Sequence, residues 1–255
     1  MAEWLIVGAG LSGSVVARKL AEAGNQVTVL EKNSFVGGNT YDPIVDGQRV
    51  HLHGPHIFHT NSQIVIDFLS QFTEWYEYEH RVLGKIGGKY VPIPFNYTSI
   101  ERLFSAKKAA TLKSVLQAAV GTKTETTIHR LLNSVDPQEA MLGKFIYKKV
   151  FKDYTRKQWG SSAKEISTSV LDRVPVRANY DDRYFVDKFQ KMPVDGFESM
   201  VKKILEHTNI NVILDVKPEE YLNRLSRDTF CVFTGPIDDF FNTATGRFHI
   251  EALTS

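Results

Sequence analysis

The sequence has almost no cysteine and no excess of either charge. Cys231 is the only cysteine among 255 residues, so no disulfide can form within the chain, and we expect a reducing compartment, the cytoplasm. The 31 Lys and Arg and 29 Asp and Glu give a net charge of +2, which argues against nucleic acid as a partner. Long apolar runs are also absent. The first run, Trp4 to Val7, is too short for a signal peptide or a membrane span.

Glycines, by contrast, are concentrated in the first forty residues. A short apolar run leads into Gly8, Gly10 and Gly13, and an Ala-rich helical pattern follows. A second apolar run, Val27 to Leu30, ends on the acidic Glu31. This order predicts a strand, a glycine turn, a helix and a second strand, which is the unit that binds a dinucleotide.

Each residue of this unit has a physical task. Gly8 permits the tight turn, Gly10 lets backbone amides approach a pyrophosphate, and Gly13 lets helix and strand pack closely. The helix N-terminus offers free N–H groups and a positive dipole end to the phosphates. Glu31 can accept hydrogen bonds from ribose hydroxyls. We therefore predict a dinucleotide site, against the alternative of a glycine turn that serves packing alone.

Two further loops follow this unit. Gly37 and Gly38 belong to a second glycine loop, which we expect to lie close to the first in the folded unit, and they would let backbone come close to a bound ligand. Four histidines then fall within nine residues, at His51, His53, His56 and His59. No cysteine or carboxylate lies among them to complete a metal site, so we predict no metal. We favour a loop that lines a ligand site, because Gly54-Pro55 interrupts the strand pattern, and a polar strand edge is the alternative.

The rest of the chain predicts an α/β protein with a discontinuous nucleotide domain. Helical patterns dominate the middle of the chain, with a capping box at Thr98 and Glu101. Residues 179–185 look strand-like, and the apolar run around Cys231 predicts a buried strand that returns to the first sheet. We expect a Rossmann-like domain, an inserted helical domain and a small antiparallel sheet domain. The Rossmann-like domain would consist of residues 1–65 and 190–240, and the helical domain of residues 98–160. The sheet domain would consist of residues 66–97, 161–189 and 241–255.

Several separated motifs together resemble the UDP-galactopyranose mutase family, over the whole length of this chain. They include the following stretches, in chain order: Gly8 to Gly13 with Glu31, Gly37-Gly38-Asn39, Gly54 to Thr60, Pro92 to Asn96, Tyr154 to Gly160, Val174 to Arg177, and Thr234 to Asp238. The resemblance implies an isomerase that interconverts UDP-galactopyranose and UDP-galactofuranose for galactofuranose-containing surface glycans. It also implies reduced FAD, whose N5 attacks the anomeric carbon, displaces UDP and forms a flavin–sugar adduct. Composition and spacing alone indicate only a dinucleotide protein.

The resemblance also implies roles for individual residues. The FAD ligands would be Gly8, Gly10, Gly13, Glu31, Lys32, Gly38, Asn39, His56, His59, Val216 and Gly235, with the two histidines beside the flavin ring. On the substrate side, Tyr154 and Trp159 match the uridine-binding stretch and Arg177 matches the arginine that binds the diphosphate. Tyr184 matches a tyrosine that contacts the phosphates. Asn96 matches a side chain near the nucleotide-sugar.

One departure from the family leaves alternatives open. The sequence stops at Ser255, whereas the family continues with a second phosphate-binding arginine, so we expect a truncated chain with weakened or absent activity. The alternatives are a non-catalytic remnant that binds FAD or a UDP-sugar, and another FAD oxidoreductase, which would need an apolar or amine-binding pocket. An NAD dehydrogenase is disfavoured by the Gly37-Gly38 loop. The choice between monomer and homodimer stays open.

Overall fold

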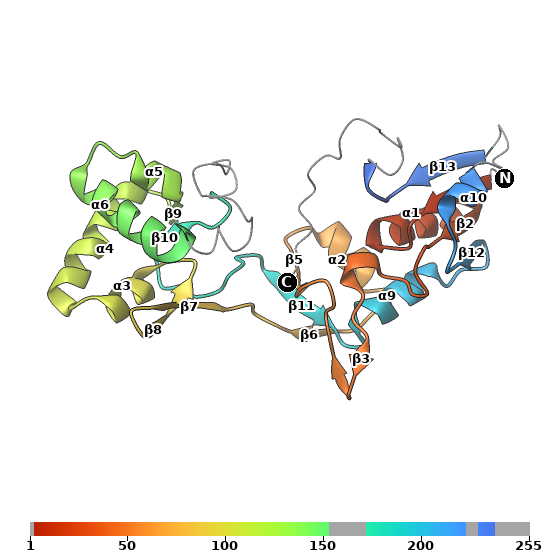
Figure 1. The fold of residues 1–255 in the computed structure, drawn as a ribbon, viewed down its shortest axis with the longest axis horizontal. Coiled ribbons are helices and arrows are strands. Elements are labelled where there is room, and N and C mark those ends of the chain that lie inside the picture. Colours follow the sequence, from red (N-terminus) through yellow and green to blue (C-terminus); the bar gives the residue numbers. More distant parts are fainter. Residues whose placement is uncertain (1–2, 153–171, 223–228, 238–255) are drawn as a thin grey trace. The chain divides into compact units, whose positions relative to one another are not determined.

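The computed structural model describes residues 3–152, 172–222 and 229–237 (Figure 1). The chain divides into two compact units. Unit 1 is built from two separate stretches, 1–78 and 188–255, and unit 2 from the stretch between them, 79–187. Each unit has a hydrophobic core of its own. The three-domain division expected from the sequence stays a prediction.

A parallel sheet organises unit 1. Its four strands lie in the order β12-β2-β1-β13, so strands from the end of the chain flank both strands from its beginning (Figure 1). The inner strands consist mainly of Val, Leu and Ile because a central parallel strand is covered on both faces. The strands are β1 (Glu3–Val7), β2 (Gln26–Leu30), β12 (Ile210–Ile213) and β13 (Thr229–Phe233).

Two helices complete the core around this sheet. Helix α1 (Leu11–Glu22) packs against β2 and against α9 (Gly196–Leu205). The residues that α1 buries are all small, which lets its axis lie close to the strands: Gly13, Ser14, Ala17 and Ala21. The N-terminus of α9 is capped from far away in the sequence. Both carboxylate oxygens of the fully buried Asp42 accept hydrogen bonds, from the N–H groups of Phe197 and Glu198, each at 2.8 Å.

The remaining elements of unit 1 are short. An antiparallel sheet has the order β5-β11-β6, and a separate hairpin joins β3 to β4. Helix α10 precedes β13, and the segment η1 is a single 3₁₀ turn. The bounds are β3 (Ile44–Val45), β4 (Gln48–Arg49), β5 (Phe58–Thr60), β6 (Trp75–Glu77), β11 (Phe189–Pro193), α2 (Gln63–Leu69), α10 (Pro218–Leu222) and η1 (Gly38–Thr40).

Unit 2 is mainly helical. A core of buried aliphatic and aromatic residues, among them Leu116, Ile128 and Ile146, joins its helices. A β7–β8 hairpin and a two-stranded β9–β10 pairing lie beside them. No helix in the described ranges is both long and apolar enough to cross a membrane. The bounds are β7 (Val82–Ile86), β8 (Lys89–Ile93), α3 (Tyr97–Leu103), α4 (Ala106–Val120), β9 (Glu125–Thr126), α5 (Ile128–Leu132), α6 (Pro137–Ile146), the π-helix η2 (Tyr147–Phe151) and β10 (Val176–Arg177).

The predicted α/β class is confirmed, and three local predictions are wrong. Residues 179–185 form an irregular loop instead of a strand, because side chains such as that of Arg177 satisfy its backbone groups. The capping box at the start of α3 is made by Asn96 and Ser99, two residues before the predicted pair. Cys231, on the edge strand β13 of the described sheet, is exposed and not buried.

Candidate functional site

The glycine turn after β1, which with Gly38 we name the glycine cradle, has no room for a side chain at Gly8 or Gly13. Gly8 has a φ of 103°, a left-handed conformation that favours glycine, and its N–H donates to the carbonyl of Leu30 at 2.8 Å. A Cβ atom on Gly13 would overlap the carbonyl oxygen of Gly8. The turn can therefore lie directly against the start of α1. The N-terminal N–H groups of this helix have no partners within the helix and suit an anion.

The second glycine loop lies against the first. Gly37 donates its N–H to the carbonyl of Ala9 at 2.9 Å and forms an isolated parallel bridge with Gly10. A Cβ on Gly38 would come within 3.1 Å of the Gly10 Cα. The two loops thus meet through bare backbone, as close approach to a pyrophosphate requires. Their predicted proximity is confirmed.

Glu31 joins the end of β2 to this turn. Its side chain is buried; Oε2 accepts from the N–H of Ala9 at 2.8 Å, and Oε1 accepts from the N–H and Nδ2 of Asn33 at 2.9 and 2.7 Å. A carboxylate has about four acceptor sites, so these three bonds leave capacity for a ribose hydroxyl. The N–H of Val216 donates to the backbone carbonyl of Glu31 at 3.2 Å, which places this predicted residue next to Glu31 at the end of β2.

The end of β13 completes the same edge of the sheet. Thr234 donates to the Val7 carbonyl through its N–H at 2.9 Å and its hydroxyl at 2.8 Å. Its hydroxyl oxygen occupies the space that a Cβ on Gly8 would need. Gly235 is exposed directly after Thr234, and Lys32 and Asn39 are exposed on their loops. The predicted cofactor residues outside the histidine segment therefore lie along one edge, and their contact with a cofactor stays a prediction.

In the histidine segment, ring nitrogens bond to backbone groups of the same segment. The N–H of His56 donates to Nδ1 of His51 at 3.3 Å, and the His56 ring nitrogen Nδ1 lies 2.9 Å from the Gly54 carbonyl oxygen. Burial lowers the pKa of His51, an effect that the nearby Asp42 carboxylate opposes. His59 lies on β5, opposite Gln190 of β11. In the described ranges, no three His, Cys, Asp or Glu side chains are placed to hold a metal ion.

A second candidate site is a cavity of about 220 Å³ in unit 2. Two of the five predicted substrate residues, Arg177 and Tyr184, line it. Arg173 is an exposed cation that lines the same cavity and was not among the predicted site residues. The sequence feature that could have indicated it is a second arginine four residues before Arg177. The other lining residues are Pro94, Glu125, Val174, Pro175, Phe185, Val186 and Asp187.

Arg177 braces one wall of this cavity. It is 3% exposed, and its two Nη groups donate to the carbonyl oxygens of Arg183 and Tyr184, the latter at 3.0 Å. Its Nε lies 3.6 Å from a carboxylate oxygen of Glu125. Since a guanidinium has five N–H donors, these contacts do not use all of its capacity. The contact with a diphosphate stays a prediction.

The other three substrate predictions have different outcomes. Asn96 is fully buried, caps α3 and does not line the cavity, so the described conformation gives it no direct access to a ligand there. Tyr154 and Trp159 lie outside the described residues.

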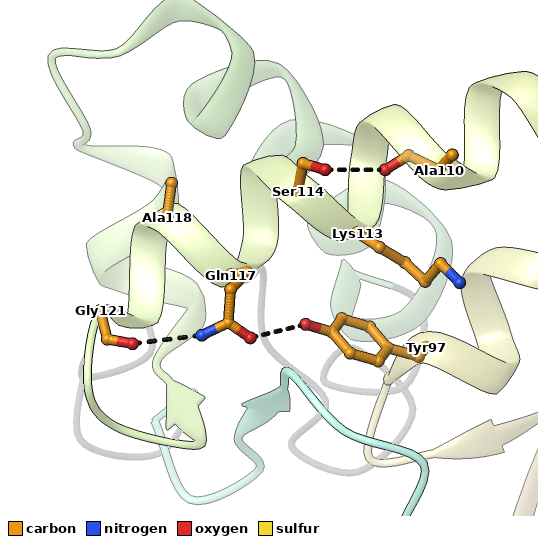
Figure 2. A pocket seen from close by; sticks show the side chains of 7 residues that line it. All are labelled: Tyr97, Ala110, Lys113, Ser114, Gln117, Ala118 and Gly121. Atoms are coloured by element: carbon orange, nitrogen blue, oxygen red, sulfur yellow. Dashed lines mark hydrogen bonds between the residues drawn. The ribbon is translucent and has the colours of Figure 1, made fainter.

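A larger, shallow groove of about 610 Å³ lies on the outer face of α4 (Figure 2). Its polar groups bond to one another: Tyr97 donates its hydroxyl to Oε1 of Gln117 at 2.9 Å, and Gln117 donates Nε2 to the Gly121 carbonyl at 3.2 Å. Lys113 at its rim is paired with Glu101. No residue predicted to bind a ligand lines this groove, and we assign no function to it.

Two family models and several curated proteins match this chain. A family model described as UDP-galactopyranose mutase matches residues 149–254, and one described as an NAD(P)-binding Rossmann-like domain matches residues 6–72. A probable UDP-galactopyranose mutase of Klebsiella pneumoniae is 38% identical over 98% of this chain and 64% of its own length. A dTDP-fucopyranose mutase of Escherichia coli is 34% identical over 98% of this chain and 67% of its own length.

A solved structure shows the same fold. The crystal structure of reduced UDP-galactopyranose mutase matches with a TM-score of 0.57 at 16% identity, over 96% of this chain and 58% of that chain. With the match to a Rossmann-like domain model, this confirms the predicted Rossmann-like fold. The chain spans 64 to 67% of the length of the two curated relatives above.

Proposed function

The chain belongs to the UDP-galactopyranose mutase family, and from this premise we propose that it acts as an FAD-dependent isomerase of a nucleotide-sugar. The proposed reaction interconverts the pyranose and furanose forms of UDP-galactose, and the product would supply galactofuranose for cell-wall glycans. We propose the cytoplasm as its location, on the basis of the single cysteine.

The glycine cradle is the observation that carries this proposal. Gly8, Gly13 and Gly38 stand where a Cβ would strike neighbouring backbone or a fixed hydroxyl, and the start of α1 offers N–H groups to a pyrophosphate. Glu31 retains acceptor capacity for a ribose. These features fit the ADP half of FAD. When bound and reduced, the flavin supplies the nucleophile of the isomerisation.

The cavity of unit 2 supports a nucleotide-sugar as the substrate. Arg173 and Arg177 place two guanidinium groups at one cavity, and this side chain suits phosphate geometry. Tyr184 adds a hydroxyl and an aromatic ring. In this proposal these residues bind and orient the diphosphate, and they take no part in proton transfer.

A dTDP-sugar is the second candidate substrate. The dTDP-fucopyranose mutase aligns over 98% of this chain, as does the Klebsiella relative. The two sugars differ at the hydroxyl of C6, and the two nucleotides differ in the base methyl and the ribose 2′-hydroxyl. The described cavity residues provide for a diphosphate, which both substrates share.

The test begins with the visible spectrum of the purified chain after addition of FAD and removal of the excess. Stoichiometric bound flavin is expected. Turnover is then measured under reducing conditions with UDP-galactofuranose and, in parallel, with dTDP-fucofuranose. Conversion of either sugar identifies the substrate. A folded chain that retains FAD but converts neither sugar would overturn the isomerase proposal in favour of the non-catalytic remnant that binds FAD. A chain that retains no FAD would overturn the cofactor assignment.

A further inference from the structure

Tyr184 reaches the cavity from an irregular loop, residues 179–185, which we name the Tyr184 loop. Because the loop has no strand partner, other groups must satisfy its backbone. Tyr97 donates its N–H to the carbonyl of Asn179 at 3.1 Å, and Tyr184 donates its N–H to the carbonyl of His80 at 2.7 Å. Arg177 holds the carbonyls of residues 183 and 184.

The middle of the Tyr184 loop is held by Asn96. Its Nδ2 donates to the Asp181 carbonyl at 3.1 Å and to Oδ1 of Asp182 at 2.7 Å. Its Oδ1 accepts from the N–H of Ser99 at 3.0 Å, which caps α3. Both amide donors and the amide oxygen are therefore used within the protein. The side chain is 0% exposed, so no donor of Asn96 remains for a ligand.

We propose that Asn96 is a positioning residue. Its amide ties the Tyr184 loop to the N-terminus of α3, and thereby holds Tyr184 and its brace Arg177 in the geometry that binds the diphosphate of the nucleotide-sugar. The inference rests on the function proposed for this cavity. It replaces the direct contact with the nucleotide-sugar that the resemblance implies for Asn96.

The two tasks of Asn96 can be separated by substitution. Asn96→Ser retains an oxygen that can cap α3, since serine is as good an N-cap as asparagine, but it removes both donors to the loop. Asp182→Ala removes the acceptor at the other end of the brace, and Asp182 does not line the cavity. Asp182→Asn keeps an acceptor oxygen and serves as the conservative variant.

The experiment measures the affinity of the FAD-loaded chain for UDP by calorimetry. Misplacement of Arg177 or Tyr184 should cost about one hydrogen bond to the charged diphosphate, which corresponds to roughly 10- to 100-fold in affinity. Asn96→Ser and Asp182→Ala are therefore each expected to weaken UDP binding by roughly this factor. The double variant is expected to bind UDP as tightly as the weaker-binding of the two single variants. Both substitutions break the same contact, the hydrogen bond between Asn96 and Asp182, so their effects should not add. Asp182→Asn is expected to restore most of the affinity, and FAD retention should not change.

A matched control comes from another helix cap of unit 2. Asp136 caps α6 through its Oδ1, which accepts from the N–H groups of Gln138 and Glu139 at 2.7 and 3.2 Å. Asp136→Ala should lower stability and leave the affinity for UDP unchanged. Hydrogen exchange gives a second measurement: amides of residues 179–185 should exchange faster in Asn96→Ser and Asp182→Ala than in Asp136→Ala.

Three results would overturn the proposal. Wild-type affinity in Asp182→Ala would show that the brace does not matter to binding. Losses that add in the double variant would indicate a direct contact by Asn96. Unchanged exchange in the loop would show that Asn96 does not hold it. A wild-type chain that binds no UDP would instead overturn the function proposed for the cavity, before any variant is compared.

Discussion

The two units build their candidate sites from different atoms. In unit 1 the site is mostly backbone: two glycine loops meet at Gly10 and Gly37, and the side chains of Glu31 and Thr234 bond to this backbone. In unit 2 the cavity is lined by long side chains, and the loop that carries Tyr184 is held by Asn96 and Arg177. The backbone site depends on local chain geometry, whereas the side-chain site depends on residues far apart in the sequence.

The units also differ in charge. Unit 2 contains 19 Lys and Arg against 11 Asp and Glu, and unit 1 contains 12 against 18. The near-neutral total of +2 thus conceals a net charge of +8 in one unit and −6 in the other. A positive field around unit 2 would attract the anionic nucleotide-sugar that we propose as substrate, and this attraction would weaken as salt increases. The charge of the whole chain does not reveal this property.

Gly13→Val should have the largest effect on unit 1. The new side chain would overlap the Gly8 carbonyl, and we expect a loss of about 3 kcal/mol of stability, near the upper end for overpacking, together with loss of the FAD that we propose to bind there. Denaturant unfolding and flavin absorbance check this. The matched change in unit 2 is Gly143→Val, whose Cβ would lie 2.8 Å from the Leu131 carbonyl carbon.

The Gly143→Val variant tests whether damage to unit 2 leaves the proposed FAD site of unit 1 intact. It should destabilise unit 2 and leave FAD retention in unit 1 unchanged, because Gly143 lies within the helical stretch. Wild-type stability and full FAD retention in Gly13→Val would contradict the cradle geometry.

Asp42→Ala should have the next largest effect. The substitution leaves the N–H groups of Phe197 and Glu198 without their carboxylate, and each of these bonds is 2.8 Å long. Loss of a buried charged acceptor predicts about 2 kcal/mol of lost stability in denaturant unfolding. Because Asp42 and α9 come from the two separate stretches of unit 1, exchange of the α9 amides should also increase. Unchanged exchange in α9 would show that the cap does not join these stretches.

A pair of histidines tests whether the two units respond alike to pH. Burial is the main cause that lowers the pKa of His51 in unit 1 and of His80 in unit 2 below the ordinary value of 6.5. Below pH 6.5 the unfolded chain then binds more protons than the folded chain, so stability should fall as the pH falls through this range. Unfolding between pH 7 and pH 5 checks this.

Substitution separates the two histidines. His51→Gln and His80→Gln should each reduce the slope of stability against pH, and each by only a small amount because both rings are partly exposed. A slope that is the same in wild type and in both variants would assign the pH dependence to other groups.

Lys113→Ala should have the smallest effect. Hydrogen bonds to Glu101 and Tyr180 raise the pKa of Lys113, and hydrogen bonds from Lys113 and Tyr180 lower the pKa of Glu101. Both Lys113 and Glu101 nevertheless remain partly exposed to solvent, where such pairs contribute little. We expect no measurable shift in the unfolding midpoint at physiological salt. A clear loss of stability would show that the rim of the α4 groove is structurally important.

Local signals predicted much of unit 1. The glycine spacing, the apolar runs and Glu31 indicated the strands and α1, because each of these elements is set by backbone conformation over a few residues. The two glycine loops were expected to meet because each follows one of the two strands in the same unit. At the start of α6, Asp136 and Pro137 likewise form an N-terminal signal within a few residues. The cap of α9 could not be predicted, because its carboxylate comes from Asp42, more than 150 residues earlier.

Residue patterns along the chain were therefore enough to predict the dinucleotide fold, the glycine cradle and, through the motifs, the resemblance to a family of sugar mutases. The contacts that the side chains of unit 2 make became known from the folded arrangement. It placed Arg177 on loop carbonyls, turned Asn96 from an expected ligand contact into a buried cap and brace, and brought Arg173 to the cavity. The physical reason is that a glycine turn is specified by its own backbone. The partners of a long polar side chain are specified by whichever distant groups folding brings within hydrogen-bonding reach.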